Sequence, residues 1–484
     1  MKKRLLALSM AMIMVAGTLT ACTPEEAPAE GGEEATEAPA EGGETATEAP
    51  ADGGEAATEA PAVQDAATME APSTEGWDES KKIYAYSWND EFGSRLQMVL
   101  DEYPQYADYV EFINLGVSGT DGTYQTAIET AMTSGDKYPS LVPADNDVAK
   151  NFTEGVGFMP VSEVGITPEM YANAYQYTVD YATVDGELMA VTWQATPGCL
   201  IYRTDIAEEV LGTSDPAEVQ EAVKDWDAFF ATADKMKEAG YKMVSGPDEV
   251  KYAMWDQQTQ PWVTTAADGS ETLTLDSSVT DYLETAKKLY DGDYTDKSSM
   301  WSDGWNANYE GKVFCYFGCT WSVYWCISTS PDSATSTYGK FHICQGPVSY
   351  HWGGTYVCVG EDTPNPELCG FLLYELCCDK DMMYKISAET ADFVNNKAAM
   401  EQIAADGVIA DPAAVLGGQN PVEIWLQSAP GIDLSNATYM DSAIKAIIDK
   451  ASEGYNSGTY ATADDAIQFI KDEVASGYTN ITVE

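Results

Sequence analysis

The first folded stretch of the chain alternates strand-like and helix-like runs. Residues 81–87 and 109–115 alternate apolar and polar side chains as strands do, and 140–143 forms a third short apolar run. Between them, residues 94–103 and 123–134 carry apolar side chains at helical spacing. Strands separated by helices predict an α/β unit with a largely parallel sheet.

The stretch VDGELMAVTWQATPGCLIYRTDI, residues 184–206, departs from this rhythm. It holds two strand-like runs, 188–192 and 199–203, broken by Pro197-Gly198. This pattern is typical of a crossing between two packed units. We expect the polar step Trp193 to Thr196 to lie at the floor of a cleft, within reach of Trp352.

A second unit follows the crossing, and the chain then returns to the first. The folded part is too long for one core, so two lobes are expected. The remaining elements that the pattern predicts are helices at 216–224, 227–239, 276–291, 366–378, 439–452 and 462–476, and strands at 312–316 and 355–360.

The first 22 residues have the pattern of an export signal. Basic residues precede the apolar run 5–15, and small residues precede Cys22. This ending resembles the lipobox of bacterial lipoproteins, which implies that Cys22 is acylated. No other stretch reaches the ~18 uncharged apolar residues of a membrane helix. We therefore expect a chain anchored by lipid to the cell membrane, facing outward and not spanning it.

Residues 23–78 have the composition of a disordered tether. They contain three copies of an 11-residue unit, beginning EGGEEATEAPA at Glu30, and 16 acidic residues with no Lys or Arg. Such a segment has too little apolar surface to offset its chain entropy, and its like charges extend it.

The net charge limits the kinds of ligand that the chain can bind, and the context of its cysteines bears on whether they form disulfides. The formal net charge of −54 repels nucleic acid and favours an uncharged or cationic ligand. Cysteines other than Cys22 lie in apolar runs such as 313–317 and 371–378. They favour buried thiols, because Cys behaves there as a small hydrophobe, and leave disulfides in an exported chain as the alternative.

The order of four segments resembles the sugar-binding lipoproteins of ABC importers, of the maltodextrin-binding type. The segments are the crossing at 184–206, NYEGKVFCYFGCT within 305–320, TYVCVGEDTPNPELCGFLLYEL at 355–376, and GYNSGTYATADDAIQFIKDEV at the end. The departures are the many cysteines and the CTW at residues 319–321, where the family often has Pro-Trp.

This resemblance implies a two-lobed periplasmic-binding-protein-like α/β fold, each lobe a mostly parallel sheet flanked by helices. The expected divisions are a signal peptide at 1–22, a tether at 23–78, lobe 1 at 79–192 and 357–405, hinges at 193–198 and 350–356, lobe 2 at 199–349, and C-terminal helices at 406–484 that belong mainly to lobe 2.

Tryptophans beside polar residues indicate a binding cleft. Aromatic faces cover the apolar face of a sugar ring, while amide and carboxylate groups bond its hydroxyls. Trp226, Trp325 and Trp425 lie in helical or apolar runs and are expected in the core. The candidate ligand-binding residues, some placed by the resemblance, are Trp88, Asn89, Glu91, Asp145, Trp193, Gln194, Thr196, Trp255, Trp305, Trp321 and Trp352.

Enzyme chemistry finds little support. The chain has 2 histidines and lacks the nucleophile-elbow, dinucleotide and P-loop motifs. Pairs of carboxylates leave a glycoside hydrolase as a weaker alternative. The cysteine spacing fits no common zinc site, and the acids at 291–296 lack the glycine and glutamate of a calcium loop. We expect no cofactor and no metal.

The expected function is capture of a carbohydrate, of oligosaccharide size, by a monomer that delivers it to an ABC permease. The ligand would favour the closed form by binding both lobes. A peptide or polyamine receptor of the same fold remains an alternative, as does a structural or adhesive surface protein.

Overall fold

A computed structural model describes residues 67–327, 336–408 and 415–483 of the chain. These residues belong to one compact unit. The signal peptide with Cys22, and the tether up to residue 66, lie outside the described residues. Their expected roles therefore stay predictions.

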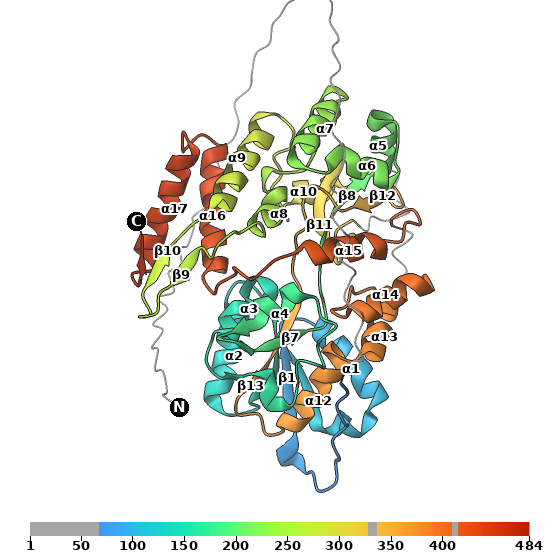
Figure 1. Ribbon diagram of the computed structural model, residues 1–484, viewed down its shortest axis with the longest axis vertical. Coiled ribbons are helices and arrows are strands. Elements are labelled where there is room, and N and C mark those ends of the chain that lie inside the picture. The colour runs from blue at the N-terminus through green and yellow to red at the C-terminus, as the bar shows by residue number, and fades with distance from the viewer. Residues whose placement is uncertain (1–66, 328–335, 409–414, 484) are drawn as a thin grey trace, which may run out of the picture. The chain divides into compact units, whose positions relative to one another are not determined.

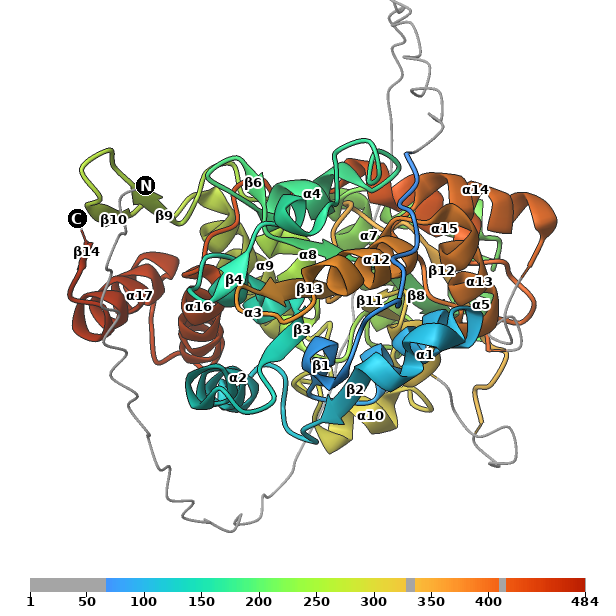
Figure 2. The same ribbon diagram turned by 90° about the horizontal axis from the view of Figure 1, so that it is seen from below.

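The first lobe is built on a six-stranded sheet. Its order is β2-β1-β3-β13-β4, and β7 also pairs with β13 (Figure 2). β1 runs parallel to β2 and β3, whereas β13 runs antiparallel to β3, β4 and β7. The strands are β1 (Ile83–Ser87), β2 (Val110–Asn114), β3 (Pro139–Asp145), β4 (Phe158–Met159), β7 (Ala190–Thr192) and β13 (Thr355–Gly360).

Helices flank this sheet in the lower part of Figure 1. α12 is buried along almost its whole length and packs on α1. A small antiparallel pair, β5 (Thr183–Val184) and β6 (Glu187–Leu188), precedes β7. The helices are α1 (Glu91–Glu102), α2 (Thr123–Ser134), α3 (Asn146–Thr153), α4 (Gln176–Ala182), α12 (Pro366–Cys377), α13 (Lys380–Thr390) and α14 (Lys397–Asp406), with short 3-10 helices at Glu79–Lys81, Pro104–Tyr109 and Val161–Val164.

The second lobe centres on β8 (Gly198–Arg203), which is flanked by β11 (Cys315–Cys319) and β12 (Phe341–Cys344). Both pairings are antiparallel, whereas mostly parallel strands were expected. Parallel contacts in this lobe are limited, among the described residues, to the isolated bridges Lys242–Val313 and Val244–Thr295 and to the short pairing of Glu271–Leu273 with Ile481–Thr482. In the main sheets of the two lobes, the prediction of parallel strands therefore holds only for β1, β2 and β3.

Helices of the second lobe occupy the upper part of Figure 1. A small sheet of β9 (Val263–Thr265), β10 (Glu271–Leu273) and β14 (Ile481–Thr482) lies beside them. The helices are α5 (Thr204–Leu211), α6 (Pro216–Val223), α7 (Trp226–Glu238), α8 (Lys251–Trp255), α9 (Ser277–Asp291), α10 (Asp303–Asn308), α11 (Ser322–Trp325), α15 (Val422–Ser428), α16 (Asp441–Asn456) and α17 (Ala463–Gly477), with 3-10 helices at Pro247–Val250 and Ala429–Gly431.

Side-chain caps define where many helices begin. Asp225 accepts from the backbone N–H of Ala228 to cap α7, and Thr462 forms a capping box with Asp465 at α17. These bonds satisfy N–H groups that have no partner within the helix. Asp145 caps α3 in the same way, so the carboxyl end of β3 runs directly into a helix.

The folded body begins earlier than residue 79. Residues 67–78, which their composition assigned to the tether, lie against the first lobe. Tyr106 Oη donates to the carbonyl of Pro72 at 2.6 Å, and the Trp77 ring meets the edge of Tyr109 at 5.1 Å. A single Trp and a Pro thus fix the end of a segment that is otherwise nearly free of large apolar residues.

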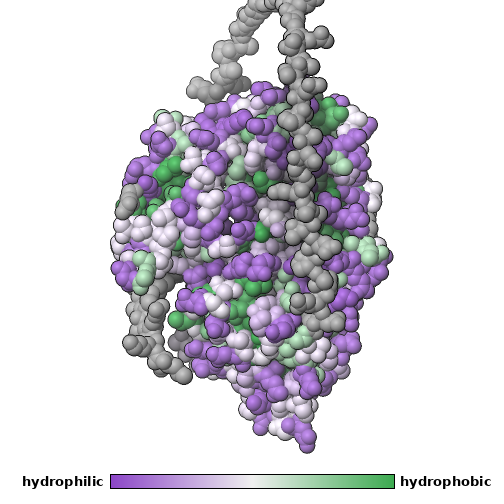
Figure 3. All heavy atoms as spheres, viewed as in Figure 1, coloured by the Kyte–Doolittle hydropathy of each residue, from purple (hydrophilic) through white to green (hydrophobic). Residues whose placement is uncertain are grey.

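The nine cysteines after Cys22 are all free thiols, and all except the partly exposed Cys326 are buried, which confirms the preferred interpretation of their context. Across the described residues, no helix is long and apolar enough to cross a membrane. Figure 3 shows that hydrophilic residues cover most of one face, with hydrophobic ones in small groups.

Close packing of α12 generates a stability prediction. A Cβ on Gly370 would lie 1.9 Å from the carbonyl oxygen of Val164, which is backbone and cannot rotate away. We expect Gly370→Ala to lower the free energy of unfolding by about 2–3 kcal/mol, as overpacking does. Urea denaturation followed by circular dichroism measures the change.

The matched control is Gly477→Ala at the end of α17. A Cβ there meets nothing within 4 Å, so alanine should leave stability unchanged or raise it by up to about 1 kcal/mol. Equal midpoints for the two variants would contradict the packing described for α12.

Candidate functional site

Two chain crossings between the sheets lie side by side. The first joins β7 to β8 through residues 193–197, and the second runs from β12 to β13. Thr196 Oγ1 donates to the carbonyl of Gly353 at 2.8 Å, and Trp352 N donates to the carbonyl of Thr196 at 3.2 Å. The polar step and Trp352 are therefore in direct contact, as expected.

A third segment holds the first crossing from its other side. The Ala195 N–H donates to the carbonyl of Phe393 at 3.0 Å, and the Asn395 N–H donates to that of Trp193 at 2.8 Å. This segment follows α13 and begins at Ala391, whose φ is +64°. Residues 193–196 thus lie between two other chain segments, and these contacts fix the directions of their side chains.

Trp193 is a supporting residue in this arrangement. Its ring is fully buried against Phe92, with ring centres 5.9 Å apart, and its Nε1 donates to Asp392 Oδ2 at 3.2 Å. A side chain with no exposed surface cannot contact a ligand directly. Its position instead fixes Asp392.

A cavity of about 320 Å³ lies between the lobes. It brings together Glu91 of α1, Gln194 of the first crossing and Trp321, which follows β11. The volume is near the lower end of the range for small-molecule sites. The remaining lining residues are Arg95, Thr320, Tyr324, Trp325, Glu389, Thr390, Ala391, Asp392 and Phe393.

A hydrogen-bonded charge network forms one wall of this cavity. Gln194 Nε2 donates to Glu91 Oε1 at 2.9 Å, and Arg95 Nε donates to Asp392 Oδ2 at 2.9 Å. Burial and the nearby Asp392 carboxylate raise the pKa of Glu91 from 4.5 to about 7, against the opposing effects of Arg95 and Gln194. Near neutral pH, Glu91 therefore interconverts between a carboxylate and an acid that can donate a hydrogen bond.

Trp321 and Trp325 line the facing wall of this cavity, and two further tryptophans pack on Trp321. Trp301 and Trp321 lie parallel with ring centres 6.0 Å apart, and Trp352 meets the edge of Trp321 at 4.7 Å. Trp321 Nε1 donates to the carbonyl of Trp352 at 3.0 Å, which fixes its ring plane. Trp301 is 54 % exposed, so this stack presents an open aromatic face.

Trp305 and Trp255 lie behind this wall. Trp305 is 2 % exposed, contacts Trp301 at 5.2 Å, and donates its indole N–H to Glu249. Burial and Asp248 raise the pKa of Glu249 to about 8. Trp255 is 3 % exposed and touches Tyr252, which stacks on Trp352 at 4.7 Å. Both tryptophans therefore position the wall more than they present a surface.

The remaining candidates lie on the first lobe. Trp88 is half-buried and meets the edge of Tyr124 at 5.4 Å, while the exposed Asn89 accepts the Glu91 N–H through its side chain at 3.0 Å. Desolvation and the carboxylates of Asp147 and Glu91 raise the pKa of Asp145 to about 7. The pKa of Asp145 therefore depends partly on the charge of Glu91.

The sequence interpretation missed several lining residues. Trp325 was assigned to the core but is 81 % exposed at the cavity, because α11 ends with it. Trp226 is partly buried against Phe317, and Trp425 is buried as expected. Arg95 and Asp392 line the cavity but carry no local motif, so no signal singled them out.

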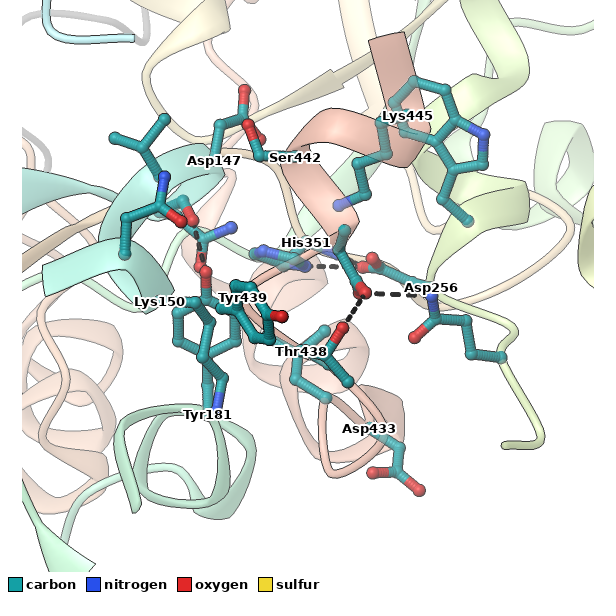
Figure 4. Close-up of a pocket in the computed structure, with 18 residues that line it drawn as sticks. Asp147, Lys150, Tyr181, Asp256, His351, Asp433, Thr438, Tyr439, Ser442 and Lys445 are labelled. Carbon is teal, nitrogen blue, oxygen red and sulfur yellow. Dashed lines mark hydrogen bonds and ion pairs between the residues drawn. The ribbon is translucent and has the colours of Figure 1, made fainter. Parts of the chain in front are cut away.

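A second, smaller cavity lies between the lobes near the crossings (Figure 4). It measures about 20 Å³ and is lined by residues of α3, α8, the second crossing and α16. Beside it, Tyr252 Oη of the second lobe donates to Asp147 Oδ2 of the first at 3.2 Å. The lobes are therefore in contact across this part of the cleft.

Across the described ranges, no group of three or more His, Cys, Asp or Glu side chains is arranged to hold a metal ion. The site's own side chains offer stacking faces, carboxylates, amides and one guanidinium.

Comparison with known proteins supplies the family. Residues 110–416 match the family model described as bacterial extracellular solute-binding protein. The chain belongs to this family. It is a solute-binding protein of an ABC transporter rather than an enzyme, and the family acts outside the cytoplasm. A comparison with curated proteins finds no match.

Solved structures share the fold of this solute-binding protein. One described as extracellular solute-binding protein family 1 has a TM-score of 0.70 and 17 % identity, covering 82 % of this chain and 99 % of that one. An ABC-transporter-associated binding protein from B. animalis subsp. lactis Bl-04, in complex with beta-1,6-galactobiose, has a TM-score of 0.62 and 18 % identity. It covers 84 % of this chain and 99 % of its own.

The galacto-N-biose/lacto-N-biose I-binding protein of Bifidobacterium longum, in complex with lacto-N-biose, gives a TM-score of 0.64 at 16 % identity, covering 83 % of this chain and 98 % of that one. These likenesses confirm the two-lobed fold class that the resemblance implied.

The raised pKa of Glu91 generates a pH prediction. In the folded state Glu91 keeps its proton up to about pH 7, whereas the unfolded chain releases it near 4.5. The folded state therefore binds more protons in this window, and its stability falls as pH rises through it. We expect Glu91→Gln to reduce that fall by roughly 1–2 kcal/mol between pH 5 and 7.5.

Glu111→Gln is the control for this pH series. Hydrogen bonds to Lys137 and Lys82 lower the pKa of Glu111 below its usual 4.5. The charged Glu111 therefore stabilises the fold throughout pH 5 to 7.5, and this contribution is lost only at lower pH. Urea midpoints across the pH range compare the variants. Parallel curves for wild type and Glu91→Gln would rule out the shifted carboxyl.

Proposed function

We propose that this solute-binding protein captures a neutral carbohydrate, of oligosaccharide size, in the cleft between its lobes and delivers it to an ABC permease. The observation that carries the proposal is the position of Trp321. Its ring belongs to the Trp301–Trp321–Trp352 stack and lines the same cavity as Glu91 and Gln194 of the opposite wall.

The two walls match the two faces of a sugar. An aromatic ring covers the apolar C–H face of a pyranose, and its edge hydroxyls bond to carboxylate and amide groups. Glu91, Gln194 and Asp392 supply such groups within the cavity, and Trp325 extends the aromatic surface at its exposed side. Binding proteins of the same fold are described in complex with galactobiose and lacto-N-biose, which supports the choice of solute.

The proposed mechanism is closure about the crossings at 193–198 and 350–356. A sugar held by Trp321 of one lobe and Glu91 of the other gains contacts that exist only when the lobes meet. Such differential binding shifts the population toward the closed form. The permease would recognise that form, and a lipid on Cys22 together with the acidic tether would hold the monomer at the outer face of the membrane.

A cationic solute is the second candidate. Glu91, Glu389 and Asp392 line the cavity, and Arg95 is its one cation among the described lining residues. This excess of acids suits a polyamine or a basic peptide, although Arg95 already pairs with Asp392.

A panel of solutes tests the proposal. β-1,6-Galactobiose, lacto-N-biose, maltotetraose and D-tagatose represent sugars, while tetra-alanine and spermidine represent the alternatives. We expect a sugar, and neither alternative, to raise the melting temperature and to bind saturably by calorimetry. If spermidine is the one compound of the panel that binds, the solute is a cation and the carbohydrate proposal is wrong.

Trp321→Ala should weaken binding of the best sugar by roughly 100-fold, because it removes the aromatic face from a largely desolvated site. Trp77→Ala is the matched control, since Trp77 packs on Tyr109 and lines neither cavity. Calorimetry should find the control within about twofold of wild type. Unchanged affinity in Trp321→Ala would remove this residue from the site.

A further inference from the structure

The small cavity of Figure 4 contains buried polar atoms that no described residue satisfies. These atoms are Asn146 Oδ1, Trp255 Nε1 and His351 Nε2, and all three residues line the cavity. Their side chains are 2 %, 3 % and 3 % exposed. A buried polar group without a partner costs about 1–3 kcal/mol, so three around one cavity point to a group that bonds them.

Two carboxylates beside these atoms already accept hydrogen bonds. Asp256 accepts from the backbone N–H of His351 at 2.7 Å, and its Oδ2 lies 2.6 Å from His351 Nδ1. Asp441 accepts from Thr438 at 2.7 Å and from Gln258 at 3.2 Å. The partnerless atoms are therefore available to bond a group that enters the cavity.

These atoms specify the chemistry of their partner. The Trp255 indole can only donate, and Asn146 Oδ1 can only accept. His351 Nδ1 lies 2.6 Å from Asp256 Oδ2, so its Nε2 is the ring nitrogen that remains to bond a partner. The partner must therefore both accept and donate hydrogen bonds, as a hydroxyl does.

Charged ligand groups fit this set poorly. An ammonium has no lone pair for the Trp255 N–H, and it would approach the Lys445 ammonium, which lies 5.5 Å from the Trp255 ring centre. A carboxylate only accepts, so it would face the lone pairs of Asn146 Oδ1. The volume of about 20 Å³ suits one hydroxyl or water-sized group and not a ring.

We infer that this cavity is a hydroxyl-binding subsite, in which Trp255 and Asn146 or His351 bond one protruding hydroxyl of the bound carbohydrate. The inference rests on the proposed function. Asn146 belongs to the first lobe, Trp255 to the second and His351 to the crossing. A hydroxyl bonded there joins both lobes and favours the closed form. Trp255, predicted as a stacking platform, thus acts through its N–H.

Trp255→Phe tests the subsite, because it removes the donor and keeps an aromatic ring. We expect it to weaken binding of the best sugar of the panel about tenfold by calorimetry. Trp425→Phe is the matched control: its indole N–H is equally buried, but it lines neither cavity. The control should stay within about twofold of wild type.

Two further measurements keep the test decisive. Asn146→Leu removes an acceptor at similar size and should weaken binding comparably, which covers a Trp255→Phe variant that does not fold. Indole 15N–1H spectra of the full chain, with the Trp255 signal assigned by its loss in Trp255→Phe, should show that signal moving when the sugar is added.

The outcomes separate the two proposals. A sugar that binds, moves the Trp255 signal and loses affinity in both variants supports the subsite. A sugar that binds with an unmoved signal and unchanged affinity in both variants overturns the subsite and leaves the proposed function standing. No sugar binding at all overturns both.

Discussion

The backbone hydrogen bonds between the chain crossings are the constraint on which the site depends. Thr196 bonds to both Trp352 and Gly353, and Gly198 N donates to the carbonyl of Tyr350 at 2.6 Å. Because residues 193–196 also bond to the segment after α13, three lengths of chain from distant parts of the sequence are held together. Gln194 and residues 391–393 of these segments line the larger cavity, and His351 lines the smaller one.

Buried carboxylates are the second feature that shapes the cleft. Glu91, Asp145 and Glu249 all have raised pKa values because they are desolvated. An apolar residue would pack at lower cost, yet each carboxyl orients a neighbour: Glu91 accepts from Gln194, Asp145 caps α3, and Glu249 accepts from Trp305. These buried carboxyl groups lower the stability of the fold, but they fix the directions of the side chains and of the helix that they bond.

Much of the fold followed from residue patterns, because local periodicity reports which face of an element is buried. The predicted helix 123–134 and strand 355–360 coincide with α2 and β13. α3 was missed because its capping aspartate and polar first turn resemble a loop. The antiparallel second lobe was missed because strand pairing depends on contacts between residues more than 100 positions apart, such as Cys315 with Tyr202.

The sequence predicted several residues of the candidate site, but not how deeply each side chain is buried. Glu91, Gln194 and Trp321 do share a cavity. Trp193, Trp255 and Trp305 have the same local signal as Trp321, an aromatic ring beside polar residues, but they are almost fully buried. Which face of an indole meets solvent depends on tertiary neighbours such as Phe92 and Glu249, and neither neighbour is visible in a window of sequence.

The free thiols have a consequence for where this fold remains functional. Burial raises the pKa of Cys199, Cys358 and Cys369 to about 12, so the reactive thiolate is scarce at neutral pH. No covalent bond closes a loop within the described residues, since all nine thiols are free. The described residues are therefore held together by non-covalent contacts alone, which a strongly reducing habitat would not weaken. Oxidants reach the eight buried sulfurs only after the chain opens, so unfolding is the step that limits their oxidation.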